Sequence, residues 1–211
     1  QSLDQLLHTC KQKSPAYSYF LKEVRMLVRT PVFFTNCIAI NFLWPIFIYA
    51  MVKIMHYNIT LDLLRNQYAE RNLRIQLLFL LGIVGISVIV AALNSLSSNA
   101  ISREGKHFSF MKYIPVSYET QWNVKTFVGI LFPAIGVLIY FIPACILIHV
   151  PVVHIIMFTL LSLMSITFVA SMGIYIDSIQ PKLIWDDEMS ALRENYNTFF
   201  SMAIAIAFTA I

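Results

Sequence analysis

Long apolar runs alternate with short polar segments along this chain. A helix needs about 20 apolar residues to cross a bilayer core about 30 Å thick, and several runs reach that length. Because the runs are continuous and do not alternate residue by residue, they indicate helices and not membrane strands. The pattern predicts an all-α fold, a polytopic transmembrane helical bundle with about five spans. The expected spans cover residues 31–52, 75–96, 126–148 and 152–176, with an incomplete span at 199–211.

The segment before the first span is amphipathic. Between Tyr17 and Arg29, apolar residues recur at the spacing of a helix, whereas charged residues fall largely on the other face. These charged residues are Lys22, Glu23, Arg25 and Arg29. The arrangement is typical of a helix that lies in the lipid headgroup layer, and an ordinary solvated helix is the alternative. Residues 1–30 are therefore expected to form a cytoplasmic or interfacial segment before a transmembrane domain over residues 31–211.

A polar, basic segment over residues 98–125 separates the second and third apolar runs. Ser102 is a candidate N-cap for a short helix that starts at Arg103, and Pro115 would end that helix. The cations expected to remain accessible to a partner or to lipid phosphate are Arg103, Lys106 and Lys112. A basic interfacial loop with no docking role is the alternative.

The composition excludes an ordinary soluble domain. Hydrophobic residues make up 58% of the 211 residues, charged residues 12%, and the mean hydropathy is +0.71, whereas soluble domains are about 45–50% apolar and about 25% charged. The three cysteines are scattered and form neither a disulfide framework nor a metal-binding spacing. The net charge of +4 gives no reason to expect a nucleic-acid partner, because membrane proteins gather Lys and Arg on their cytoplasmic side anyway.

Lys and Arg are distributed unevenly between the polar segments. Eleven of the 15 lie in residues 1–30, 98–125 and 177–197, and four lie in the link between the first two spans. Cytoplasmic loops carry an excess of Lys and Arg, so the first set is assigned to the cytoplasm. We therefore expect a multi-pass protein of the cell membrane with a cytoplasmic N-terminus. Because the chain begins at Gln1 and stops within an apolar run, it is also expected to be a piece of a longer membrane protein.

No sequence motif for catalysis or cofactor binding is evident. The chain has no Gly-x-x-x-x-Gly-Lys-Ser/Thr loop for ATP, no Gly-x-Ser-x-Gly and no His-Glu-x-x-His. The acidic cluster Asp186, Asp187 and Glu188 could bind a cation, but capping of a helix that starts there is the favoured interpretation. His149 and His154 bracket a tight turn, where two interfacial histidines are favoured over a metal pair. No cofactor or metal is therefore expected in this chain.

Small and polar residues interrupt the spans. Gly82 and Gly85 are expected to allow close helix approach, although they do not have the Gly-x-x-x-Gly spacing. Asn36 and Asn41 are expected to pack against other helices, because polar groups are expensive in lipid. Contact of these two asparagines with a substrate is the alternative.

Three stretches of sequence resemble motifs of a known transporter family. They are LKEVRMLVRTPVFFTNC at Leu21–Cys37, SREGKHFSFMKYIPVS at Ser102–Ser117 and PKLIWDDEMSALRENYN at Pro181–Asn197. The order of the predicted elements is an amphipathic helix, two spans, a basic cytoplasmic helix, two spans, a cytoplasmic link and a fifth span. Together with this order, the three stretches resemble the C-terminal half of the ABC exporter permeases of Gram-positive bacteria, which belong to the type-2 exporter class. The resemblance spans most of residues 17–211. The Ser-Arg-Glu-Gly-Lys stretch and the Pro-Val-Ser that follows it are fairly specific for this family, whereas the hydrophobic spans occur in many membrane proteins.

This resemblance implies a transport subunit without an ATPase site of its own. A separate ATPase subunit would bind ATP and Mg, and its movement would push a cytoplasmic coupling helix while the spans rearrange around a path between two permease halves. The residues that the resemblance assigns to the coupling region are Ser102, Arg103, Glu104, Gly105, Lys106, Lys112 and Pro115. The helix at Tyr17–Arg29 would be the interfacial connecting helix. The implied partners are the ATPase subunit, a second permease half and membrane lipid, and the absence of a charged pocket in the spans favours an amphipathic or apolar cargo such as a peptide or lipid.

Two other functions stay open at this point. One is a membrane-embedded, metal-dependent enzyme acting on lipid or prenyl groups, with the metal held by Asp186, Asp187 and Glu188. The other is a non-transport membrane scaffold or immunity protein, whose central segment binds a different partner. The first predicts metal-dependent activity without ATP, and the second predicts no effect on any ATPase.

Overall fold

The computed structural model describes residues 14–210, except residues 55–56, 70–72 and 194. Every regular element in this part of the chain is helical, which confirms the predicted all-α class. The expectations for residues 1–13 and for residues 70–72, which include Lys11, Lys13 and Arg71 of the charge count, lie outside the described residues.

Three helices are long and apolar enough to cross a membrane, as a membrane protein requires. They are α6 (Leu73–Leu93), α7 (Tyr118–Ile148) and α8 (Val152–Ile179). A fourth span is counted if α2 (Pro15–Arg29) and the helix that follows it to Leu43 form one broken span, although the two meet at 91°. The described residues therefore give three to four candidate spans, and the expected count of about five is not confirmed. The last helix, α10 (Tyr196–Ala210), has 15 residues, fewer than the about 20 that a bilayer core requires.

Local capping explains where two of these helices begin. Ser117 Oγ accepts a backbone hydrogen bond at 3.3 Å, so α7 starts at Tyr118 and not near residue 126 as expected. Ser14 caps α2 in the same way at 3.3 Å, and Pro15 takes the first helical position, where its missing N–H is not needed. The predicted amphipathic helix at the N-terminal end of the described chain is therefore confirmed.

A π-helical turn interrupts the first expected span. The chain runs through α3 (Pro31–Phe33), the π-helix η1 (Phe34–Ala39) and α4 (Ile40–Ile54). Asn41 is buried, donates through Nδ2 to Cys37 O at 2.8 Å, and accepts at Oδ1 from Asn94 Nδ2 at 2.8 Å. Because Asn94 directly follows α6, the expectation that Asn41 packs against another helix is confirmed. Asn36 donates instead to Val32 O of its own helical stretch at 2.8 Å.

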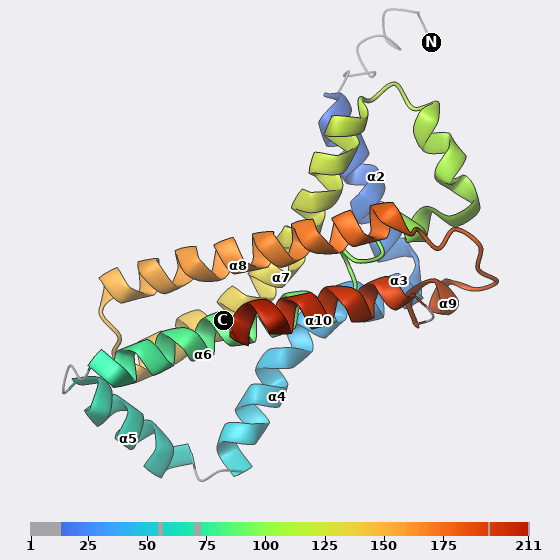
Figure 1. Ribbon diagram of the computed structural model, residues 1–211. Helices are drawn as coiled ribbons and strands as arrows, with labels where there is room; N and C mark the ends of the chain where they lie inside the picture. The colour runs from blue at the N-terminus through green and yellow to red at the C-terminus, as the bar shows by residue number, and fades with distance from the viewer. Residues whose placement is uncertain (1–13, 55–56, 70–72, 194, 211) are drawn as a thin grey trace, which may run out of the picture.

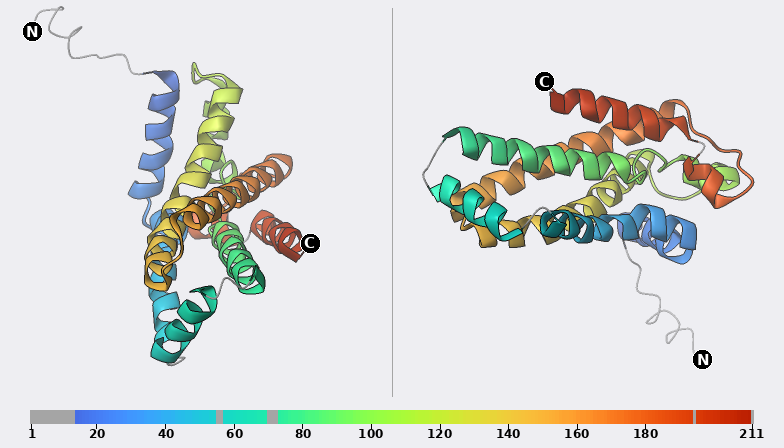
Figure 2. Two further views of the ribbon diagram at one scale, coloured as in Figure 1. Left: turned by 90° about the vertical axis from the view of Figure 1, so that its left-hand side faces the viewer. Right: turned by 90° about the horizontal axis from the view of Figure 1, so that it is seen from below.

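The helices form a crossed arrangement (Figures 1 and 2). α6, α8 and α10 pack against one another, and α7 crosses from α8 to α2 and α4. At one end of the molecule, α5 (Tyr57–Ala69) lies beside the turn between α7 and α8. At the other end lie a 3-10 helix, η2 (Ser102–Lys112), and the short α9 (Glu188–Arg193). Polar sites can therefore form at two well-separated ends.

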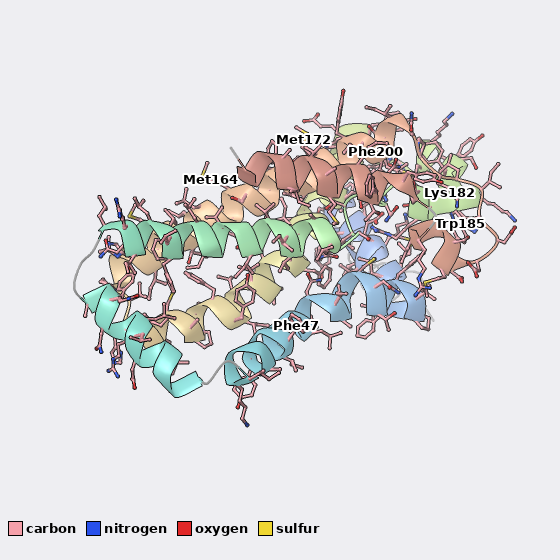
Figure 3. The ribbon with its side chains drawn as sticks, turned by 60° about the horizontal axis from the view of Figure 1, so that its bottom comes forward. Phe47, Met164, Met172, Lys182, Trp185 and Phe200 are labelled. Carbon is pink, nitrogen blue, oxygen red and sulfur yellow. The ribbon has the colours of Figure 1, made fainter. Side chains whose placement is uncertain are left out.

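Large apolar side chains cover the outer faces of the helices. Figure 3 shows Phe47 of α4, Met164 of α8 and Phe200 of α10 pointing outwards, and these side chains are 58%, 68% and 51% exposed. In a soluble protein such faces would be buried against a core. Their exposure fits helices surrounded by lipid.

Glycines of α7 and α8, and not those of α6, make the close helix contacts. A Cβ added at Gly136 would lie 2.9 Å from both Asn41 Cβ and Asn41 O, and one added at Gly173 would lie 3.1 Å from Ser98 N. Gly82 and Gly85 have nothing within 4 Å of such a Cβ, so the expectation that they allow close helix approach is wrong. Among the described residues, no neighbouring helix therefore comes close to either glycine.

We expect Gly136→Ala to lower the free energy of unfolding by about 1–3 kcal/mol, because the new methyl group meets fixed backbone of Asn41. Gly82→Ala is the matched control and should leave stability unchanged or slightly higher, because alanine has the better helix propensity. Unfolding of the purified protein in detergent measures both. Equal losses for the two variants would contradict the packing argument.

Candidate functional site

Two lysines and two glutamates join α2, η2 and α7. Lys125 of α7 donates hydrogen bonds to Glu23 Oε1 at 2.8 Å and to Glu104 Oε1 at 2.7 Å. Lys22 of α2 donates to the same two oxygens, at 3.2 Å for Glu23 and 2.5 Å for Glu104. We call these four residues the ion network. It brings together three segments that lie far apart in the sequence.

Burial makes this network dependent on complete pairing. The side chains of Lys125, Glu23 and Glu104 are 2%, 1% and 5% exposed, and only that of Lys22, at 37%, reaches the surface. An ammonium group has three N–H donors, and Lys125 uses its third on Ala100 O at 2.9 Å. Two positive and two negative charges therefore balance inside the protein, with every donor of the buried ammonium satisfied.

The charge state of Glu23 follows from its neighbours. Burial alone would raise the pKa of this carboxyl, but the charges of Lys125 and Lys22 outweigh it, and the pKa lies below its ordinary range. Glu23 therefore stays ionised at neutral pH. The ring of Tyr19 covers the network, with its centroid 5.1 Å from Lys22 Nζ and 5.9 Å from Lys125 Nζ. These distances lie within the range of about 6 Å for cation–π attraction.

Arg103 lies buried beside the ion network. It is 4% exposed, and its Nη1 donates to Leu96 O at 2.6 Å. The prediction that Arg103 remains accessible to a partner is therefore wrong. Its guanidinium is used inside the protein, because a buried carbonyl in the turn after α6 needs a donor.

Asp177 fixes the start of η2 to α8. Its Oδ2 accepts hydrogen bonds from Ile101 N at 2.6 Å and from Ser102 N at 3.0 Å. Its Oδ1 accepts from the Ser102 hydroxyl and from Asn197 Nδ2 at 2.9 Å. The carboxylate is fully buried, and four donors compensate its charge. We call this carboxylate and its hydrogen-bonded partners the Asp177 network.

Ser102 is not the helix cap that the sequence predicts. The residue at the N-cap of η2 is Ile101, which makes no side-chain capping bond. The Ser102 hydroxyl instead donates to Asp177 and accepts from Lys182 N at 2.9 Å and from Asn195 Nδ2 at 3.0 Å. A hydroxyl oxygen has two acceptor positions, and Lys182 N and Asn195 Nδ2 occupy both, so none is left for a backbone N–H of η2. Ser102 therefore ties η2 to α8 and to the segment that follows α8.

Gly105 marks the point where η2 changes direction. Its φ of 52° lies in the left-handed region, which favours glycine. An added Cβ would lie 2.5 Å from Trp185 Cζ2, and Trp185 Nε1 donates to Ser102 O at 3.0 Å. The backbone conformation and the indole ring therefore both require glycine at this position.

Beyond Gly105, η2 presents a basic and aromatic surface. We call this surface the exposed end of η2, and it consists of Lys106, Phe110, Lys112 and Tyr113. The two aromatic side chains are 65% and 82% exposed. Pro115 is also exposed but does not itself end the helix, because η2 stops at Lys112. The predicted coupling residues thus divide into a buried group, Ser102 to Gly105, and an exposed group.

The charged residues of α2 divide in the same way. Arg25 and Arg29 are exposed, as expected for the polar face of an interfacial helix, and Lys22 is partly exposed. The prediction that Glu23 shares that face is wrong, because its side chain is fully buried. Lys125, 102 positions further along the chain, supplies the compensating charge.

Two charged residues at the centre of the site are not among the residues predicted from the sequence. Lys125 and Asp177 lie at the borders of the polar segments 98–125 and 177–197, which only the count of Lys and Arg had drawn on. The signal that could have identified them is their place at the border of an apolar run, where a buried ionisable residue needs a partner.

The remaining candidates play structural roles or offer no ligand set. Asp187 Oδ1 accepts from Ser190 N at 2.7 Å at the start of α9, which confirms the predicted capping by the acidic cluster. Within the described ranges, no group of three or more His, Cys, Asp or Glu residues is arranged to hold a metal ion. The metal-dependent enzyme therefore has no ligand set of that size in this part of the chain.

Glu23→Gln should lower the free energy of unfolding by about 3 kcal/mol, because it leaves the charge of Lys125 incompletely compensated. Arg25→Gln, an exposed change on the same helix, is the matched control and should stay within about 0.5 kcal/mol of wild type. Unfolding in detergent again provides the measurement. A loss for Glu23→Gln no larger than that of the control would show that the ion network does not stabilise the fold.

Comparison with known proteins adds no family assignment. No family model, curated protein or solved structure matches the chain. The function must therefore be argued from the ion network, the Asp177 network and the exposed end of η2.

Proposed function

We propose that this chain is the permease part of an ATP-driven type-2 ABC exporter, which moves an amphipathic or apolar cargo, a peptide or a lipid, across the cell membrane. A separate ATPase subunit binds ATP and Mg and supplies the energy, and a second permease half completes the path. The observation that carries the proposal is the architecture of η2. One end is fixed by buried networks to several helices, and the other end is exposed, basic and aromatic.

The fixed end connects η2 to helices on two sides. Glu104 joins it to α2 and α7 through the ion network, and Ser102 joins it to α8 and the segment before α10 through the Asp177 network. Removing one partner of a buried ion pair costs about 3–5 kcal/mol. A displacement of η2 is therefore expected to carry these helices along and not to separate η2 from them.

The exposed end fits a partner surface of complementary chemistry. Lys106 and Lys112 carry positive charge, and Phe110 and Tyr113 are of the aromatic type that protein interfaces favour. The partner is expected to offer acidic side chains around an apolar pocket. The excess of Lys and Arg in the segments on this side supports a cytoplasmic position for η2, where an ATPase subunit would reach it.

Charge reversal at the exposed end tests docking. The full-length protein carrying Lys106→Glu and Lys112→Glu is co-purified with its candidate ATPase subunit, after thermal unfolding has shown that it is folded. We expect bound ATPase to fall by about tenfold or more, because two attractive charges become repulsive. Lys53→Glu changes an exposed lysine near the end of α4 and should bind like wild type.

Ser102→Ala separates transmission from docking. It leaves the exposed end intact and removes one link of η2 to the Asp177 network, so bound ATPase should stay within about twofold of wild type while ATP turnover of the complex falls. Equal ATPase binding by the charge-reversed and control proteins would contradict the docking role. Finding no ATPase with the wild-type protein would contradict the exporter and favour a membrane scaffold.

A further inference from the structure

A cavity with several hydrogen-bonding side chains lies at the end of the molecule opposite η2 (Figure 1). It has a volume of about 400 Å³ and lies between α5, the start of α6 and the turn that joins α7 to α8. Its lining consists of Tyr68, Ala69, Gln76, His149, Pro151 and His154. Four of these six side chains can form hydrogen bonds. No residue of the ion network or the Asp177 network contributes to it.

The exposed Arg65 lies next to this cavity, in contact with one of its lining residues, His149. The Nη2 atom of Arg65 lies 3.0 Å from His149 Nε2. A guanidinium group only donates, so the imidazole nitrogen is the acceptor of this contact. Arg65 forms no ion pair with a carboxylate among the residues that the structure describes. Within that part of the chain, its guanidinium therefore contacts an imidazole and no carboxylate.

The backbone fixes the ring of His149 at this position. His149 ends α7 with a φ of 61°, in the left-handed region, and its N–H donates to carbonyls of the last turn of α7. On the other side of the cavity, the hydroxyl of Tyr68 is hydrogen-bonded to His154 Nδ1, and Tyr68 is 5% exposed. Groups from α5, the turn and α8 therefore converge on one cavity, in positions set by the fold.

The ends of the candidate spans indicate how deep in a membrane the cavity lies. α6 starts at Leu73, α7 ends at Ile148 and α8 starts at Val152, so the cavity lies where the hydrocarbon layer gives way to headgroups. Leu73 and Val152 are 69% and 70% exposed, which leaves apolar surface for acyl chains beside the polar groups. A phosphate group would meet a guanidinium, imidazoles and a phenol there.

We propose that this cavity binds a phosphate group, with Arg65 as the principal cationic contact and His149, His154 and Tyr68 as further hydrogen-bonding groups. A guanidinium pairs with phosphate through two parallel N–H donors, and an exposed arginine that pairs with no carboxylate among the described residues has such donors to offer. The phosphate comes from a phospholipid headgroup or from a small phosphate in solution. This site is separate from η2 and goes beyond the proposed export function.

Native mass spectrometry of the full-length protein in detergent tests the site. The probes are phosphatidylglycerol, diacylglycerol as its phosphate-free counterpart, and inorganic phosphate. Arg65→Gln should weaken binding of phosphatidylglycerol by about tenfold and leave diacylglycerol unchanged, because only the first carries the group that arginine recognises. Lys53→Gln removes one exposed positive charge near α4's end and should bind like wild type.

Competition separates the two sources of phosphate. If inorganic phosphate displaces phosphatidylglycerol from wild type but not from Arg65→Gln, the cavity accepts phosphate from solution; if it does not displace the lipid, the headgroup is the ligand. Both results support the proposal. Equal binding of phosphatidylglycerol and of inorganic phosphate by wild type and Arg65→Gln overturns it. If Arg65→Gln does not fold, His149→Gln provides the same comparison.

Discussion

The ammonium of Lys125 is the contact on which the architecture of η2 depends. It lies where α2, η2 and α7 meet, and it donates to Glu23, Glu104 and Ala100. Without it, the two buried carboxylates would keep only the partly exposed Lys22 as a hydrogen-bonded countercharge among the described residues, with the buried Arg103 nearby. The effective cost of taking an uncompensated carboxylate out of water is several kcal/mol. The ion network therefore decides how η2 is placed relative to α2 and α7. Apolar packing alone would not specify this junction of three helices.

Polar networks have this importance because the surroundings of the spans are apolar. Lipid tails are as apolar as leucine, so helices in a membrane gain little from hiding apolar faces against each other. Close contacts at small residues and paired polar groups must specify the arrangement instead. Gly136 against Asn41 supplies the first kind, and the Asp177 network supplies the second. Each of these two contacts joins segments that are distant in sequence. Such contacts fix the positions of the crossed helices relative to one another.

The sequence predicted those features that depend on local pattern. Continuous apolar runs indicated α6, α7 and α8, helical spacing indicated α2, and a cluster of three acidic residues indicated the start of α9. Features that depend on a distant partner could not be predicted. Glu23 looks like a surface residue until Lys125 is known to meet it, and Ser102 looks like a cap until Lys182 N and Asn195 are known to donate to its hydroxyl oxygen. Glycine spacing likewise says nothing about which face of a helix meets a neighbour, so Gly82 was favoured where Gly136 makes the contact.

The two polar ends of the molecule differ in a way that bears on their roles. The ion network is balanced in charge and almost closed, whereas the exposed Arg65 contacts an imidazole beside an open cavity. A buried network in which the central ammonium has no donor to spare resists separation, which suits an element that transmits movement. A guanidinium that pairs with no carboxylate among the described residues keeps donors for a ligand. α7 carries Lys125 near its first residue and His149 just past its last, so one helix runs between both sites. A ligand at either end can bias the other only if it binds two arrangements of that helix with different affinity.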